Sequence, residues 1–298
     1  MKELVIISGK GGTGKTSIVA AFAALAKNAV FADCDVDAAD LHLVLEPKAK
    51  QINDFSGGKK AFIITEKCIG CGKCQDMCRF DAIDFNGNGN DIVDKTFTID
   101  PVSCEGCKVC VEFCPVDAIE FHDHINGQWF VSETRWGPMV HARLGIAEEN
   151  SGKLVTLIRQ QAKEIASEQR RNLIIVDGSP GIGCPVIASI TGADVVLIVT
   201  EPTLSGKHDL ERVADLTASF GIKTLICINK ASVNSEITGQ IVGDARQRGL
   251  KVVGEIPYDD AFTKAQIMGA TLIEYTGGDI AERVKALWRH VTYELVSD

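Results

Sequence analysis

The sequence predicts an α/β fold in which a mainly parallel, helix-covered sheet is interrupted by a small inserted α+β module. Three observations support this prediction. Short β-branched runs alternate with helical patterns everywhere outside residues 56–135. A glycine-rich turn joins the first of these runs to the first helical pattern. The intervening stretch breaks the rhythm with cysteine, glycine and aspartate, and it contains an internal repeat.

The strands and helices outside the insert can be placed from their residue patterns. The expected strands are short apolar runs bounded by Gly, Asp, Asn or Pro, namely Lys2–Ser8, Ala29–Asp33, Asn172–Asp177, Val195–Thr200, Thr224–Asn229 and Val252–Ile256. The expected helices carry apolar residues three and four apart, namely Lys15–Lys27, Gly152–Glu168, Gly206–Phe220, Ser235–Arg248 and Asp279–Leu295. Near-continuous apolar strands indicate a parallel sheet, because both faces of such a sheet are buried.

Composition narrows the class of protein. A chain of 298 residues suffices for one domain of roughly 200 residues with a small second one. The net charge of -9, without any run of Lys or Arg, argues against a nucleic-acid-binding surface. No apolar run approaches the ~20 residues that cross a bilayer, and the first residues lack the pattern of a signal peptide. We therefore expect a cytoplasmic protein.

The turn after the first expected strand matches the phosphate-binding pattern G-x-x-x-x-G-K-[ST]. It comprises Gly9, Lys10, Gly11, Gly12, Thr13, Gly14, Lys15 and Thr16. Glycines allow backbone N–H groups to turn toward a phosphate, and the N-terminus of the following helix adds positive potential. In this pattern Lys15 reaches the β- and γ-phosphate oxygens, and Thr16 offers its hydroxyl to Mg²⁺. The flanking strand and helix distinguish the match from an ordinary glycine-rich turn.

Acidic residues follow two of the expected strands. Asp33, Asp35 and Asp37 come at the end of the second strand, and Asp177 ends the third. Open α/β sheets bind their ligands at the carboxyl ends of the strands, so these carboxylates are candidate ligand-site residues. The alternative is that they only cap the helices that follow.

The cysteines indicate a metal site. Of eleven cysteines, eight fall in two tight runs, and metal binding explains such runs better than disulfides outside a small secreted protein. The runs are Cys68, Cys71, Cys74 and Cys78, then Cys104, Cys107, Cys110 and Cys114, at an offset of 36 residues. The repeat continues beyond the cysteines, since residues 81–85 read DAIDF and residues 117–121 read DAIEF. A duplicated half-module is the simplest account.

The spacing C-x₂-C-x₂-C-x₃-C is that of bacterial ferredoxins with two [4Fe-4S] clusters, in which the fourth cysteine of each run ligates the other cluster. The predicted ligand sets are therefore Cys68, Cys71 and Cys74 with Cys114, and Cys104, Cys107 and Cys110 with Cys78. The first run ends in Cys78-Arg79, whereas the second ends in the usual Cys-Pro. Structural zinc is the competing interpretation, although zinc sites rarely use this spacing.

Nearly the whole chain resembles the MinD-superfamily P-loop ATPases, here with an inserted ferredoxin domain. Lys10 makes the phosphate loop the deviant Walker A motif of the MinD/ParA/ArsA and nitrogenase iron-protein group, and the segments 33–37 and 173–181 resemble its switch regions. The resemblance implies a P-loop NTPase domain over residues 1–55 and 136–298 and a ferredoxin-like insert over 56–135. It also implies ATP or ADP and Mg²⁺ as ligands, and an ATP-dependent homodimer or paralogous heterodimer.

The same resemblance assigns roles to single residues. Lys10 would reach the partner's nucleotide across the dimer, Asp35 would orient the attacking water, and Asp177 would hold Mg²⁺ through water. The implied site comprises catalytic Lys10, Lys15 and Asp35, base-contacting Asn229 and Pro257, and the Mg²⁺ residues Thr16 and Asp177. The family usually has Asn where this chain has Asp40. Catalysis would consist of positioning and charge neutralisation around an in-line water.

Three cysteines lie outside the runs. Cys34 and Cys227 fall in strand-like segments and are expected to be buried free thiols. Cys184 stands seven residues after Asp177, the spacing at which the nitrogenase iron protein carries a ligand of its bridging cluster. The other ligand of that cluster has no evident counterpart, so the role of Cys184 stays open. The apolar stripe of residues 280–295 is expected to pack on the sheet rather than on lipid, so membrane contact is not expected.

Three functions fit these observations. The favoured hypothesis is an ATP-gated redox or metallocofactor-assembly protein that delivers electrons to an unidentified protein partner or client. The second is a MinD/ParA-like spatial-organisation ATPase, acting in cell division or positioning, with structural or redox-sensing clusters. The third is an iron–sulfur scaffold or carrier. Eight ferredoxin-spaced thiolates favour stable electron-transfer clusters over a labile cargo.

Overall fold

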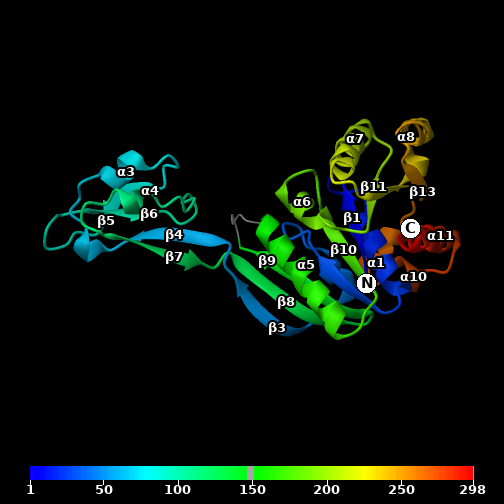
Figure 1. The fold of residues 1–298 in the computed structure, drawn as a ribbon, viewed down its shortest axis with the longest axis horizontal. Helices are drawn as coiled ribbons and strands as arrows, with labels where there is room; N and C mark the ends of the chain where they lie inside the picture. Colours follow the sequence, from blue (N-terminus) through cyan, green and yellow to red (C-terminus); the bar gives the residue numbers. More distant parts are fainter. Residues whose placement is uncertain (146–150, 298) are drawn as a thin grey trace. The chain divides into compact units, whose positions relative to one another are not determined.

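A computed structural model describes residues 1–145 and 151–297, and it divides the chain into two compact units (Figure 1). Residues 1–53, 129–143 and the described residues from 151 onward form the first unit. Residues 54–128, with Leu144 and Gly145, form the second. Residues 129–135, which the sequence placed in the insert, therefore belong to the first unit. The assignment of the two units to the two expected domains stays a prediction.

The first unit is built on a nine-stranded sheet with the order β13-β12-β11-β1-β10-β2-β9-β8-β3. Its strands are β1 Lys2–Ser8, β2 Ala29–Asp33, β3 Lys48–Phe55, β8 Gly127–Thr134, β9 Gly137–Leu144, β10 Leu173–Pro180, β11 Val195–Thr200, β12 Lys223–Ile228 and β13 Lys251–Glu255. The pairings from β13 to β9 are parallel. All six strands expected from the sequence are present, and the mainly parallel sheet is confirmed.

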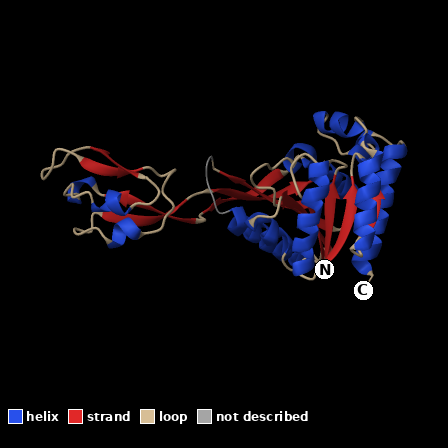
Figure 2. Ribbon diagram, turned by 90° about the horizontal axis from the view of Figure 1, so that it is seen from above, coloured by secondary structure: helices blue, strands red, loops and turns tan. Residues whose placement is uncertain are grey.

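Helices lie on both faces of this sheet (Figure 2). They are α1 Lys15–Leu25, α2 Leu41–Leu45, α5 Ser151–Glu168, α6 Cys184–Ile190, α7 Leu204–Ser219, α8 Ser235–Gln247, α9 Ala261–Ile267, α10 Leu272–Tyr275 and α11 Asp279–Val296. Five of these were expected, and the sequence missed the short α2, α6, α9 and α10. Each central strand buries side chains on both faces, which is why its sequence is apolar throughout.

The carboxy-terminal helix α11 packs into the core, as its apolar stripe predicts. Val284 and Val291 are fully buried in one cluster with Leu4 and Ile6 of the central strand β1. A side chain at Gly254 of β13 would collide with Leu287 of this helix, so helix and strand approach closely there. Among residues 1–145 and 151–297, no helix is both long and apolar enough to span a bilayer.

The second unit is small and internally repeated. β4 Gly58–Ile63 pairs antiparallel with β7 Ile119–His124, and β5 Ile83–Gly87 pairs antiparallel with β6 Thr96–Ile99. The short helices α3 Lys73–Met77 and α4 Val109–Glu112 occupy equivalent places in the two repeats, after a 3-10 turn at Thr65–Lys67 in the first. The buried core of this unit includes Cys68 and Cys74 among its apolar side chains.

Candidate functional site

The glycine-rich loop joins β1 to α1, and its glycines are needed by the backbone. Gly12 and Gly14 have φ of 80° and 87°, in the left-handed region that other residues avoid. A side chain on Gly14 would also collide with the amide of Asn229. Helix α1 starts at Lys15 without a side-chain cap, so its first N–H groups are available to a phosphate.

Lys15 lies at the centre of a buried ion-pair group. Its side chain is 5% exposed, and its Nζ is 2.5 Å from Asp177 Oδ1 and 3.3 Å from Asp35 Oδ2. Burial lowers the pKa of Lys15, but the two carboxylates outweigh this effect and raise the pKa above its ordinary value. Lys15 is therefore a cation over the whole physiological pH range, placed where the phosphates of a nucleotide would enter.

Three carboxylates gather at the ends of β2 and β10. Asp33 and Asp177 are 1% and 0% exposed, and the Oδ2 atom of each makes no hydrogen bond within the described residues. Burial, and then the charge of Asp177, raises the pKa of Asp33 well above its usual range. Burial also raises the pKa of Asp35, against the opposing effect of Lys15. Neither Asp33 nor Asp177 caps a helix; unpaired buried carboxylate oxygens instead suit a divalent cation such as Mg²⁺.

The remaining switch residues are more exposed. Asp37 and Asp40 have solvent-exposed side chains, and Asp40 precedes α2 without capping it. Thr16 is half-buried one residue after Lys15. Thr16 and the free oxygen of Asp177 are the groups that would hold Mg²⁺, so the donor set fits this ion.

Lys10 pairs with a carboxylate that the sequence interpretation missed. Its Nζ lies 2.7 Å from Glu201 Oε1, and it donates to the hydroxyls of Ser205 at 3.0 Å and Thr203 at 3.3 Å. Lys230 binds the other oxygen of Glu201 at 2.8 Å and donates to Gly12 O at 2.9 Å. Burial raises the pKa of Glu201, but the two lysines outweigh it and lower the pKa below the ordinary value. Glu201 follows β11 directly, a strand-end position that could have revealed it.

A cavity of about 190 Å³ opens beside the loop. It is lined by Gly12, Gly14, Ser17, Asn229, Lys230, Pro257, Tyr258, Asp259, Phe262, Thr263 and Gln266. The Nδ2 atom of Asn229 donates to Thr13 O at 2.8 Å, which leaves the side-chain oxygen as an acceptor. The structure thus brings Asn229 and Pro257, which are far apart in the sequence, to one cavity next to the phosphate loop.

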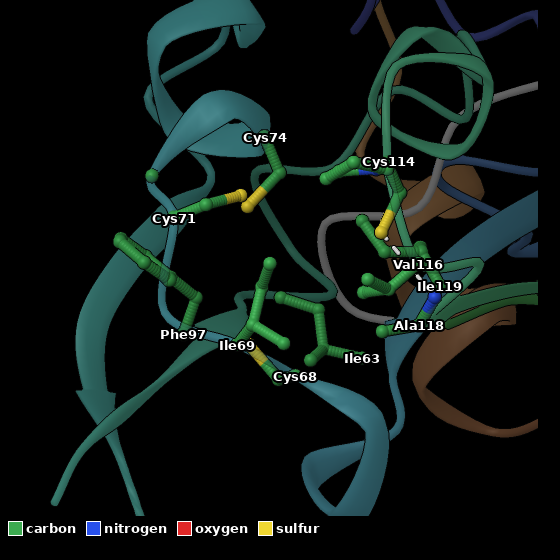
Figure 3. Close-up of a pocket in the computed structure, with 12 residues that line it drawn as sticks. Ile63, Cys68, Ile69, Cys71, Cys74, Phe97, Cys114, Val116, Ala118 and Ile119 are labelled. Carbon is green, nitrogen blue, oxygen red and sulfur yellow. Dashed lines mark hydrogen bonds between the residues drawn. The ribbon is translucent and has the colours of Figure 1, made fainter. Parts of the chain in front are cut away.

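In the second unit, four cysteines line one cavity (Figure 3). They are Cys68, Cys71, Cys74 and Cys114, the first set expected from the spacing. The other lining residues are apolar and include Ile69, Phe97 and Ile119. The backbone N–H of Ala118 donates to Cys114 Sγ at 3.3 Å. Burial raises the pKa of the Cys74 thiol to about 11.

The other four cysteines line a second cavity. They are Cys78, Cys104, Cys107 and Cys110, the second expected set, and the lining also includes Phe80, Glu105 and Lys108. Burial raises the pKa of the Cys110 thiol to about 11. Within the described part of the chain, no three His, Cys, Asp or Glu side chains converge on a single metal ion. Thiolates around one zinc ion lie about 4 Å apart, whereas a cubane spreads its thiolates more widely.

The three other cysteines are free thiols. Cys34 and Cys227 are fully buried, as expected, and burial raises the pKa of Cys227 to about 12. Cys184 is exposed at the start of α6. Its role stays open.

Comparison with known proteins identifies the family of the chain. A family model described as the CobQ/CobB/MinD/ParA nucleotide binding domain matches residues 4–272. The chain belongs to this family. It is a P-loop ATPase of the MinD/ParA type, as the phosphate loop and its surroundings predict.

Two relatives of this MinD/ParA-type ATPase come from Methanocaldococcus jannaschii. Uncharacterized protein MJ0578 is 34% identical over 96% of this chain and 95% of its own length. Uncharacterized protein MJ0579 is 26% identical over 92% and 94%.

Solved structures share the fold. The cell division ATPase MinD of Pyrococcus furiosus has a TM-score of 0.58 at 15% identity, covering 98% of each chain. MinD of Pyrococcus horikoshii, complexed with Mg-ADP, has a TM-score of 0.57 at 16% identity, covering 97% of this chain and 95% of its own. McdA of Cyanothece has a TM-score of 0.55 at 15% identity, covering 98% and 99%. These comparisons support the ATPase prediction and do not bear out the inserted ferredoxin domain, which stays a prediction.

Proposed function

We propose that this ATPase binds Mg-ATP at residues 9–16 and uses hydrolysis to switch an ATP-dependent dimer, formed with a second copy or a paralogous chain. The ion-pair group of Lys15 with Asp177 and Asp35 carries this proposal. An entering γ-phosphate would attract Lys15 away from both carboxylates, because the phosphate carries more negative charge than a carboxylate does. Asp35 would then be free to orient the attacking water, and Asp177 and Thr16 would hold Mg²⁺, which neutralises charge on the phosphates.

Adenine is the base that the cavity beside the loop would accept. Asn229 donates one of its two amide N–H groups to Thr13 and retains its Oδ1 atom as an acceptor. An acceptor pairs with the exocyclic amine of adenine and opposes the carbonyl oxygen of guanine. We therefore expect ATP to be hydrolysed in preference to GTP.

Two finer functions are compatible with this switch. In the first, the second unit holds two [4Fe-4S] clusters and the nucleotide state gates electron delivery to a protein partner. Its support is the grouping of eight cysteines into two cavities of four, in the sets that ferredoxin spacing requires. An iron–sulfur carrier would use the same cavities, and rapid cluster transfer to an apo-protein would distinguish it.

The second finer function is spatial organisation, in which the ATP-bound dimer positions a partner and the cysteine module is structural or redox-sensing. The comparisons favour this alternative over the redox function, since the solved structures of this fold include MinD cell division proteins and a ParA family ATPase. The redox function is supported by cysteine geometry alone.

One experiment separates the two. Anaerobically purified protein is assayed for ATPase rate with the metal centres oxidised or reduced, while their absorbance and EPR signals are followed as ATP is added. A rate that depends on redox state, or a cluster signal that depends on nucleotide, supports gated electron transfer. Iron-loaded protein with neither response, together with ATP-dependent recruitment to a partner or filament, supports spatial organisation. The Lys15→Ala variant controls for nucleotide binding.

A further inference from the structure

The two cysteine cavities come from repeated sequence but differ in the contacts of their fourth cysteines. In the first cavity the N–H of Ala118 donates to Cys114 Sγ at 3.3 Å, a bond drawn in Figure 3. Ala82 stands in the same place relative to Cys78 of the other cavity. Across residues 1–145 and 151–297, no hydrogen bond to Cys78 Sγ is found. Only one of the two fourth cysteines therefore accepts a backbone N–H.

The backbone around the two alanines is similar but not identical. Each alanine follows an aspartate with φ of 50°. Ala118 and Ala82 are 2% and 1% exposed, and the carbonyl of each accepts a backbone N–H at 2.8 Å, from Ile64 and Asp100 respectively. The Asp117 N–H donates to Cys114 O at 3.5 Å, and the described residues show no equivalent bond from Asp81 to Cys78. The repeats thus differ in the bonds that the fourth cysteine accepts at its sulfur and at its carbonyl oxygen.

The residue after the cysteine also differs between the repeats. Cys114 is followed by Pro115, whereas Cys78 is followed by Arg79. Proline fixes its own φ and restricts the residue before it to extended backbone, so Pro115 limits the conformations in which Cys114 can present its sulfur. Arg79 imposes no such limit, although Cys78 is also extended, with φ of -77° and ψ of 119°.

We propose that the Ala118 N–H raises the reduction potential of the cluster held by Cys68, Cys71, Cys74 and Cys114, so that the two clusters are inequivalent. This inference rests on the proposed iron–sulfur function. Reduction moves one electron from a low-potential reductant such as dithionite to a cluster and breaks no bond. The thiolate sulfurs carry part of the added negative charge, and a donor at Cys114 Sγ stabilises the more negative state.

Charged residues in the other cavity do not replace this donor. Glu105 and Lys108 line that cavity with opposite charges, and Lys108 also pairs with Glu112 at 2.5 Å. The charges offset one another, and both side chains of the Lys108–Glu112 pair are more than half exposed to screening solvent. The Ala118 N–H, by contrast, is fixed in a buried turn, where a hydrogen bond is electrostatically stronger.

The test is a matched pair of proline substitutions in the full chain, loaded with iron and sulfide anaerobically. Ala118→Pro removes the donating N–H, and Ala82→Pro removes the equivalent N–H that makes no such bond. Midpoint potentials are measured by EPR-monitored titration with dithionite. We expect Ala118→Pro to lower one midpoint potential and leave the other unchanged, and Ala82→Pro to shift neither. Equal shifts in both variants, or no shift in Ala118→Pro, would overturn the inference.

A second variant avoids placing proline at a buried site. Pro115→Ala frees the backbone after Cys114 without adding a charge, and Pro115 is exposed. We expect it to weaken the Ala118 bond and to lower the potential of the first cluster only. Potentials unchanged in both Pro115→Ala and Ala118→Pro contradict the inference while leaving the electron carrier intact. An unsubstituted chain that assembles no cluster refutes the proposed electron carrier as well.

Discussion

The nucleotide site and the cysteine module differ in what stabilises them without a ligand. At the nucleotide site, the cation of Lys15 is already paired with Asp177 and Asp35, and Lys10 is already paired with Glu201. In the cysteine module, the groups that face each cavity are thiols and apolar side chains, with one acid and one base at the second cavity.

From this difference we expect the nucleotide site to fold before its ligand arrives and the cysteine module to need its ligand to fold. The nucleotide site lies at the carboxyl ends of the central strands of a large sheet, and these strands are almost entirely buried. The second unit spans residues 54–128 and has a core in which Cys68 and Cys74 take part. So small a core stabilises a unit weakly, and metal ligation is a common supplement.

The largest expected effect belongs to Lys15→Ala. We expect the ATPase rate to fall about 10³-fold, because the γ-phosphate loses its main fixed cation. The free energy of unfolding should fall by about 3 kcal/mol, since Asp177 and Asp35 become buried carboxylates without a partner. Steady-state kinetics and urea denaturation measure the two effects. Lys27→Ala, at an exposed position after α1, is the control and should change neither. A rate within tenfold of the unsubstituted protein would contradict the proposed site.

Asp35→Asn tests catalysis without disturbing the fold. We expect hydrolysis to slow about 10²-fold while ATP binding is retained, because the amide cannot orient water as the carboxylate does. Asp37→Asn, two residues away and exposed, should keep the full rate. Single-turnover kinetics and nucleotide titration distinguish the two. Equal loss in both variants would assign the effect to the loop and not to Asp35.

Cys74→Ser tests the cysteine module on its own. The substitution removes a buried thiol of the first cavity, so we expect the iron bound per chain to fall to about half, with ATP affinity unchanged. The exposed Cys184→Ser variant should retain full iron content. Elemental analysis and the EPR spectrum provide the measurement. Stoichiometric zinc in the unsubstituted protein, in place of iron, would refute the cluster assignment.

Removing the metal should affect the cysteine module and leave the nucleotide site unchanged. Treatment with an iron chelator under oxidising conditions is expected to expose residues 54–128 to proteolysis while ATP binding persists. Limited proteolysis followed by mass spectrometry locates the cleavage. A second unit that resists protease without metal would show that its apolar core is sufficient.

The central strands, the phosphate loop and the cysteine sets could be predicted because each is encoded by residues close together in the sequence. The six strands from β1 to β13 that read as continuous apolar runs were all found, and so was the loop before Lys15. The cysteine spacing predicted which four thiols would share a cavity. Spacing can do so because three cysteines of each set belong to one short run, and the ferredoxin repeat assigns the fourth to the other run.

Features that depend on distant residues could not be predicted. Strands β3, β8 and β9 were missed. Side chains of β3 are largely exposed, and β8 is only half-buried and lacks a clear alternation. Helices α2, α6, α9 and α10 are too short to show a period. Glu201 gains its significance only when the fold brings Lys10 and Lys230 to it. The bond from Ala118 is made by a backbone group, which no residue identity reveals.

The smallest expected effect concerns Asp33, which the nucleotide site buries at a cost to stability. Its pKa is raised by burial and by Asp177, so the folded protein binds a proton more tightly than the unfolded one. The contribution of Asp33 to stability therefore falls as the pH rises from about 3.9 through the raised folded-state pKa.

The substitution Asp33→Asn removes this titration. We expect the free energy of unfolding of the nucleotide-free protein to rise by about 1 kcal/mol at neutral pH, with a flatter pH dependence. Urea denaturation at pH 5 and pH 8 tests this, with exposed Asp40→Asn as the control. If Asp33→Asn is instead destabilised, the net effect of the paired charges is to stabilise the folded nucleotide site. The nucleotide site would then differ more strongly from the thiol-lined cavities.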